Sequence, residues 1–166
     1  IGAKTAALNG LDVKKSEIHG MAQRGGSVIS QVRFGERVYS PIITDGTSDL
    51  LVSFDRLEAL RWRHLLAPQG QVLINDLYLM PVTVSSGQQP DVPDLAERLR
   101  AEYPQAAYVD GLAIAVRLGN ARAMNLVLAG AISTRLPFAA ETWERAMRER
   151  IPAKMLEVNL AAFAAG

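Results

Sequence analysis

Residues 50–75 read LLVSFDRLEALRWRHLLAPQGQVLIN, and this stretch decides the fold class. It begins with a continuous apolar run at residues 50–54, which is typical of a strand covered on both faces. Asp55 follows at the position of a helix N-cap. Pro68-Gln69-Gly70 is expected to end the helical part, and residues 71–75 form the next buried strand. Strand, helix, turn and strand make a right-handed βαβ unit, so the sequence predicts a parallel sheet.

The remainder of the chain continues this mixture of helices and strands. Further strands are predicted at residues 12–18, 27–34 and 106–109. Helices are predicted at residues 1–9, 93–102, 111–118, 121–133, 141–149 and 154–164. Residues 81–92 are polar and rich in turn formers, which indicates a surface loop. We therefore expect one Rossmann-like α/β domain over residues 1–166, with a mostly parallel sheet, helices on both faces and a helical C-terminal portion.

Several side chains carry more detailed expectations. In the strand at 27–34, one face is expected to hold Val28, Ser30, Val32 and Phe34. Asn120 is a good N-cap for the helix that follows it. Asn125 lies in an apolar helix, where an unpaired amide is costly, so it is expected to bond to the loop at residues 20–26. Two i,i+4 ion pairs are expected on a solvated helix face, Glu141–Arg145 and Glu144–Arg148.

Composition narrows the class of protein. The 166 residues are 49% hydrophobic and 21% charged, which is ordinary for a soluble globular domain. The net charge of +1 gives no general attraction to nucleic acid or to an anionic membrane surface. No apolar run reaches membrane-spanning length. The expected location is therefore the cytoplasm, without nucleic-acid or membrane partners.

The absence of cysteine is the most informative count in the sequence. Iron–sulfur clusters are normally held by cysteine thiolates, so this chain cannot hold one by itself. Disulfides and thiol nucleophiles are excluded as well. The only histidines are His19 and His64, and the aspartates at 45, 49, 76 and 110 lack the spacing of a metal site. We therefore assign no catalytic residue and no metal ligand to this chain.

A glycine-containing segment at residues 16–28, SEIHGMAQRGGSV, is the least ordinary part of the sequence. The Gly25-Gly26 pair permits positive φ and a close approach of backbone, so successive N–H groups can face one concavity. Arg24 adds a planar fork of donors that suits phosphate or carboxylate. The residues themselves predict either an anion site or a tight interface loop, and they do not choose between the two.

The same segment resembles a known family. EIHGMAQRGGS, at residues 17–27, is similar to a signature of the gamma-type subunit or domain of 2-oxoacid:ferredoxin oxidoreductases, above all in the beta subunit of the indolepyruvate branch. Other pieces resemble the family in order: Tyr39-Ser40-Pro41, Gly119-Asn120 with Arg122 and Asn125, and Pro152-Ala153-Lys154 before Asn159 and Phe163. The family's first strand and Gly-Gly-Gln-Gly-type turn do not precede the helix at residues 1–9, so we expect them to be missing from this chain.

The resemblance implies an accessory subunit that is inactive alone. Its enzyme would decarboxylate an aryl pyruvate oxidatively to an acyl-coenzyme A and pass electrons to ferredoxin. Thiamine diphosphate and iron–sulfur clusters would reside on the partner alpha subunit. Coenzyme A would lie at the subunit junction, against the cofactor-binding residues His19, Gln23, Arg24, Gly25, Gly26 and Ser27. Two alternatives remain open: a stand-alone nucleotide- or coenzyme-binding module, and a purely structural interaction domain.

Overall fold

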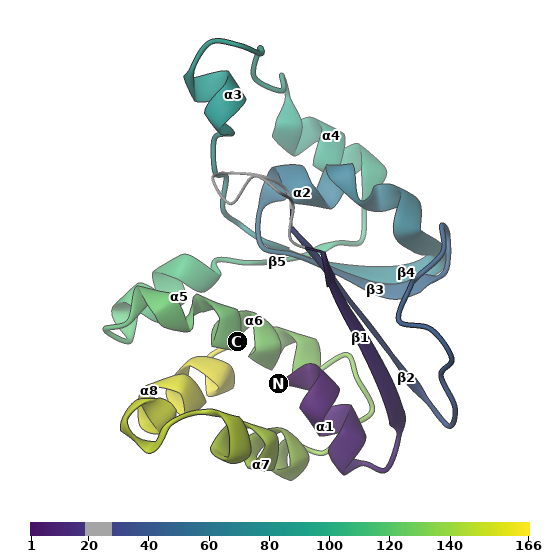
Figure 1. The fold of residues 1–166 in the computed structure, drawn as a ribbon. Coiled ribbons are helices and arrows are strands. Elements are labelled where there is room, and N and C mark those ends of the chain that lie inside the picture. The colour runs from purple at the N-terminus through teal and green to yellow at the C-terminus, as the bar shows by residue number, and fades with distance from the viewer. Residues whose placement is uncertain (19–27) are drawn as a thin grey trace. The chain divides into compact units, whose positions relative to one another are not determined.

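The computed structural model describes residues 1–18 and 28–166, which form two compact units (Figure 1). The helical unit comprises residues 1–15, 32–42 and 109–166, and the sheet unit comprises residues 16–31 and 43–108. The strands are β1 (Asp12–Ile18), β2 (Ile29–Gly35), β3 (Ser48–Ser53), β4 (Leu66–Asn75) and β5 (Ala107–Val109). The helices are α1 (Gly2–Leu8), α2 (Arg56–Arg61), α3 (Val82–Ser85), α4 (Leu95–Glu102), α5 (Gly111–Arg117), α6 (Met124–Ser133), α7 (Ala140–Arg150) and α8 (Ala153–Ala164), with 3₁₀ turns η1 (Arg63–Leu65) and η2 (Ala121–Ala123). The α/β class is confirmed.

The sheet unit is built on the predicted strand–helix–strand arrangement. β3 pairs in parallel with β4, and β5 joins the other edge of β4. In register, Leu51 lies opposite Val72 and Val52 lies opposite Leu73. Helices α2 and α4 contact each other and lie on one side of this sheet in Figure 1. β1 and β2 pair with each other in a separate two-stranded sheet.

A small core joins α2 and α4 to the sheet. Its buried members are Ala59, Val72, Ile74, Leu99 and Tyr103. The Tyr103 hydroxyl donates a 2.7 Å hydrogen bond to the carbonyl oxygen of Ala59, which ties the end of α4 to α2. Burial, with a further contribution from the Glu102 carboxylate, raises the pKa of Tyr103 to about 12. The phenol therefore remains a neutral donor at physiological pH.

β4 is longer than predicted. Pro68, Gln69 and Gly70 were expected to form a turn, and instead they lie inside the strand. Ser48 pairs with Leu66 but Leu50 pairs with Gln71, so the extra residues of β4 are accommodated by an irregularity in the ladder. A Cβ at Gly70 would come within 2.7 Å of the Ser48 carbonyl oxygen, so glycine permits this close approach of β3.

Two local expectations in the strands and loops were also wrong. Phe54 lies beyond the end of β3 and is 47% exposed, since the strand ends at Ser53. The alternation predicted for residues 27–34 named no buried face; in β2 the buried side chain is Gln31, whose amide oxygen accepts the Ile43 N–H at 2.8 Å, and Val28 is 59% exposed. The predicted loop at residues 81–92 contains the short helix α3.

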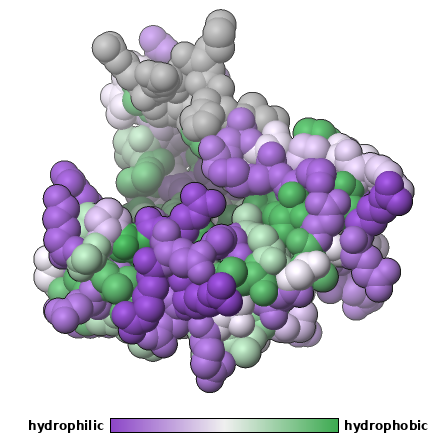
Figure 2. Space-filling view, turned by 60° about the horizontal axis from the view of Figure 1, so that its bottom comes forward, coloured by the Kyte–Doolittle hydropathy of each residue, from purple (hydrophilic) through white to green (hydrophobic). Residues whose placement is uncertain are grey.

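The helical unit packs α6 against α8 and α5, and α7 against α1 and α8. The buried centre of this packing consists of Ala115, Ala123, Leu126, Val127, Ala129, Met147 and Ala162. On α8, Leu156, Leu160 and Phe163 pack against that centre. Figure 2 brings the lower part of Figure 1 toward the viewer and shows hydrophilic side chains over much of this face, with small hydrophobic areas between them.

Two of the polar predictions in this unit are confirmed. Asn120 caps η2, because its side-chain oxygen accepts the Arg122 N–H at 3.1 Å. Arg148 pairs with Glu144 on the exposed face of α7. The contact of Nε with the carboxylate is 3.1 Å long.

One other was wrong. Arg145 pairs with Glu149 at 3.0 Å rather than with Glu141. A hydrogen bond from Lys4 is the largest cause that lowers the pKa of the Glu149 carboxyl, and a hydrogen bond from Arg145 is the next. The Lys4–Glu149 pair also links α1 to the end of α7. Asn125 is exposed on α6, and its predicted partner, the loop at residues 20–26, lies outside the described residues, so that contact stays a prediction.

Candidate functional site

The predicted cofactor-binding residues lie outside the described residues. They are His19, Gln23, Arg24, Gly25, Gly26 and Ser27. In sequence they stand between β1, which ends at Ile18, and β2, which begins at Ile29. Their assignment therefore stays a prediction.

The other family-like pieces serve local structure where they are described. Tyr39 is 81% exposed, and the Arg37 guanidinium lies 5.1 Å from the centre of its ring. Gly119 has a φ of +81° and ends α5 ahead of the Asn120 cap. Asn159 is buried and donates a 2.7 Å hydrogen bond to the Met155 carbonyl oxygen within α8.

The loops that follow β3 and β4 are tied together at the carboxyl edge of the sheet. Asp55 caps α2, because its Oδ1 accepts the N–H groups of Leu57 at 2.7 Å and Glu58 at 3.3 Å. Its Oδ2 accepts the Leu79 N–H at 2.6 Å from the loop after β4. Asn75 adds a bond in the reverse direction, since its side-chain N–H donates to the Phe54 carbonyl oxygen at 3.0 Å. We call these contacts the edge strap.

The two roles of Asp55 can be separated by substitution. Asp55→Asn keeps an oxygen for the cap but loses the acceptor for Leu79, so we expect a loss of about 1–2 kcal/mol in unfolding free energy. Asp55→Ala loses the cap as well, and the expected loss is about 3 kcal/mol. Urea unfolding followed by far-UV circular dichroism measures both values.

Asp110→Asn is the matched control for this series. Asp110 caps α5 through one bond to the Ala113 N–H, at 2.9 Å, and asparagine is an equally good N-cap. That variant should be nearly as stable as the parent protein. If Asp55→Asn were equally neutral, the bond to Leu79 would contribute nothing.

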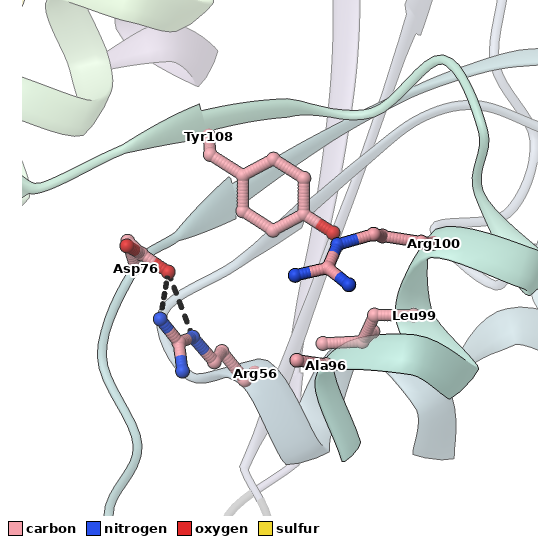
Figure 3. A pocket seen from close by; sticks show the side chains of 6 residues that line it. All are labelled: Arg56, Asp76, Ala96, Leu99, Arg100 and Tyr108. Carbon is pink, nitrogen blue, oxygen red and sulfur yellow. Dashed lines mark hydrogen bonds and ion pairs between the residues drawn. The ribbon is translucent and has the colours of Figure 1, made fainter. Parts of the chain in front are cut away.

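A pocket opens at the same edge of the sheet, within the sheet unit. Its volume is about 250 Å³. The lining residues are Arg56, Asp76, Ala96, Leu99, Arg100 and Tyr108. Arg56 begins α2, Asp76 follows β4, and Tyr108 belongs to β5, so the residues converge because parallel strands end at one edge. Figure 3 shows the polar ends of Arg100 and Tyr108 pointing into the pocket.

Charge in the pocket is partly compensated. The Arg56 Nε donates to Asp76 Oδ1 at 2.7 Å, and its Nη2 donates to the same oxygen (Figure 3). Across residues 1–18 and 28–166, neither the Arg100 guanidinium nor the Tyr108 hydroxyl has a protein hydrogen-bond partner. Leu99 and Ala96 supply an apolar wall. The pocket therefore presents cationic and hydroxyl donors beside a single carboxylate.

Sequence reasoning missed this pocket. In the sequence Asp76 is one of four scattered aspartates, and no pattern singles out Arg56 or Arg100. The available signal was the position of Arg56 and Asp76, each of which comes soon after a predicted strand. In the described part of the chain, no group of three or more histidine, aspartate or glutamate side chains is placed to hold a metal ion. No helix there is sufficiently long and apolar to cross a membrane.

Comparison with known proteins gives consistent matches over nearly the whole chain. A family model described as "Pyruvate ferredoxin/flavodoxin oxidoreductase" matches residues 1–166. "Indolepyruvate oxidoreductase subunit IorB" of Methanothermobacter thermautotrophicus is 34% identical over 98% of this chain and 85% of its own length. The protein of the same name from Pyrococcus horikoshii is 36% identical over 97% of this chain and 83% of its own length.

Solved structures match in fold. The gamma subunit of keto/oxoacid ferredoxin oxidoreductase from Geobacter sulfurreducens has a TM-score of 0.67 at 21% identity, covering 99% of this chain and 83% of that one. The 2-oxoglutarate:ferredoxin oxidoreductase from Magnetococcus marinus, with 2-oxoglutarate, coenzyme A and succinyl-CoA bound, has a TM-score of 0.70 at 19% identity. That match covers 97% of this chain and 26% of the longer one.

Proposed function

Since this chain belongs to the pyruvate ferredoxin/flavodoxin oxidoreductase family, we propose that residues 1–166 act as one gamma-type domain that completes a shared active site. The chain is an accessory subunit of a 2-oxoacid:ferredoxin oxidoreductase of the indolepyruvate type. The observation that carries this conclusion is the 34–36% identity to IorB subunits over almost the full chain. The complete enzyme would convert an aryl pyruvate and coenzyme A to an acyl-coenzyme A and carbon dioxide, with electrons passing to ferredoxin.

The redox groups of this reaction belong on another chain. This sequence contains no cysteine, so it offers no thiolate for an iron–sulfur cluster. We place the clusters and thiamine diphosphate on an alpha subunit, to which ferredoxin would also bind. The present chain would then contribute positioning and the exclusion of water from the junction.

Coenzyme A is the group that this chain would help to hold, and its thiol would accept the acyl group. The residue chemistry suits its phosphates: Arg24 supplies a guanidinium fork, and the N–H groups of Gly25, Gly26 and Ser27 supply backbone donors. His19 and Gln23 would line the same junction. These residues would bind and orient the coenzyme, and none of them is required to exchange electrons.

Exposed apolar side chains support contact with a partner. Phe54 is 47% exposed, Leu79 is 62% exposed and Met80 is 55% exposed. The edge strap holds the two loops that carry them, which fixes their positions before any partner binds. Aromatic residues and methionine are enriched in protein interfaces.

Co-purification tests the subunit assignment. The chain is expressed together with its candidate alpha partner, and we expect one complex that oxidises indolepyruvate faster than the alpha subunit alone. Failure to form a complex, together with no gain in activity, would overturn the assignment. Tight binding of a nucleotide by the chain without any complex would favour the stand-alone module instead.

Arg24→Ala tests the coenzyme contact within that complex. Loss of a charge-assisted contact of about 1.5–3 kcal/mol should raise KM for coenzyme A roughly 10- to 100-fold. KM for the 2-oxoacid should change little, because that substrate would not meet the guanidinium. Arg37→Ala is the matched control, since Arg37 is exposed and stacks on Tyr39. Equal losses for both substrates would indicate that Arg24 serves assembly alone.

A further inference from the structure

The pocket between α4 and the carboxyl edge of the sheet has the chemistry of an anion site. Arg56, Arg100 and Tyr108 reach it from three different elements, α2, α4 and β5. Ligands of α/β sheets bind preferentially at this edge. Nothing in the proposed role of residues 19–27 uses these side chains.

The charge of the pocket is positive after internal pairing. Arg56 donates through Nε and Nη2 to the same oxygen of Asp76, so the net charge of this pair is close to zero. Arg100 then remains as a full positive charge without an ion-pair partner among residues 1–18 and 28–166. The Tyr108 hydroxyl, which likewise has no partner there, adds a neutral donor (Figure 3).

The size and shape of the pocket limit the kinds of ligand that it can bind. A volume of about 250 Å³ is below the range of roughly 300–1,000 Å³ that encloses a drug-sized ligand, so the pocket takes one end of a molecule or a small ion. A guanidinium fork and a hydroxyl converging from different directions suit the several oxygens of a tetrahedral phosphate better than a planar carboxylate. The Tyr108 ring is 43% exposed and offers a face for a planar group attached to that phosphate.

We propose that Arg100 and Tyr108, with the Arg56–Asp76 pair beside them, form a binding site for a phosphate monoester. Arg100 binds the phosphate oxygens through its fork. Tyr108 donates to a further oxygen and covers the attached group. Leu99 and Ala96 line the pocket beside these two donors.

The test is calorimetric titration of the full chain with inorganic phosphate, adenosine monophosphate, adenosine and acetate. Both phosphates should bind, adenosine and acetate should not compete with them, and the monophosphate should bind more tightly than inorganic phosphate. Arg100→Gln should weaken phosphate binding at least tenfold, and Arg100→Lys should restore part of it. Tyr108→Phe should cost about threefold to tenfold.

Arg98→Gln is the matched control. Arg98 is exposed on the same helix but faces a different hollow of the surface, beside Arg61 and Arg63. Its replacement removes the same charge and should leave phosphate affinity unchanged. An equal loss of phosphate affinity in the Arg98→Gln and Arg100→Gln variants would show attraction by general charge and would overturn the site. Phosphate binding that Arg100→Gln leaves unchanged would also overturn it. Effective competition by acetate would do the same. Thermal unfolding midpoints of the variants check that each remains folded.

A second pair of titrations identifies the source of the phosphate monoester. Coenzyme A carries such a group and dephospho-coenzyme A lacks it. If Arg100→Gln weakens the binding of coenzyme A but not that of dephospho-coenzyme A, the site holds the coenzyme. If Arg100→Gln weakens the binding of adenosine monophosphate but of neither coenzyme A nor dephospho-coenzyme A, the site holds a separate phosphorylated molecule. Both outcomes retain the site, and neither depends on Arg24 or on complex formation, so this inference and the proposed function can fail independently.

Discussion

Replacing Gly130 by alanine is expected to destabilise the helical unit by about 2–3 kcal/mol. Gly130 lies in α6, where that helix packs against the end of α8. A Cβ at this position would lie 2.0 Å from the Phe163 carbonyl oxygen and 3.0 Å from its carbonyl carbon. Both are backbone atoms, so α8 must move to accept even one methyl group. The higher helix propensity of alanine, worth about 1 kcal/mol, offsets only part of this cost.

Urea unfolding followed by near-UV circular dichroism measures the effect, because that signal reports aromatic packing. Gly35→Ala is the matched control: the nearest atom to its added Cβ would be Val38 Cγ2, at 4.0 Å. That variant should differ from the parent by less than about 0.5 kcal/mol. If Gly130→Ala were equally harmless, the contact of α6 with α8 would be loose enough to widen at no cost.

Trp143→Ala is expected to be more damaging, with a loss of about 3–5 kcal/mol. Trp143 is 1% exposed, and its ring centre lies 5.7 Å from that of Phe163 and 6.4 Å from that of Phe138. It also lies against Gly2 of α1, where an added Cβ would be 3.6 Å from the indole ring. Truncation would therefore leave a cavity that α1, α7 and α8 share.

Trp143→Phe should cost much less, about 1–2 kcal/mol. The indole N–H of Trp143 is buried without a hydrogen-bond partner in the part of the chain that the structure describes. Phenylalanine removes this unpaired donor, which offsets part of the lost packing. Urea unfolding of the two variants gives the comparison, and equal losses would show that the aromatic ring kept by Trp143→Phe contributes nothing to the packing.

The parts of the fold that depend on local patterns were predictable. The strand at Asp12–Ile18 and the helices from α5 to α8 follow the expected periodicity, and the Asp55 and Asn120 caps are where their sequence positions indicate. The errors arose where tertiary pairing outweighed local preference. Pro68 and Gly70 favour turns, yet they lie within β4. The reason is that β3 pairs with β4 on both sides of them, at Leu66 and again from Gln71.

Side-chain environment was harder to predict than chain path. Gln31 is buried because the Ile43 N–H needs an acceptor, which no alternation of apolar residues reveals. Asn125 is exposed because the buried face of α6 is set by α5 and α8, and the apolar neighbours of Asn125 in sequence lie on that face. The predicted site at residues 19–27 remains a prediction from sequence. The pocket of Arg56, Asp76 and Arg100 needed coordinates, because strand ends distant in sequence meet there.

The distribution of tryptophan has a practical consequence. The chain contains two, and Trp62 belongs to the sheet unit while Trp143 belongs to the helical unit. Each unit therefore carries its own intrinsic fluorophore. Trp62→Phe and Trp143→Phe proteins would each emit from one unit alone, so that quenching by acrylamide could follow the opening of either half when a partner subunit or a coenzyme is added.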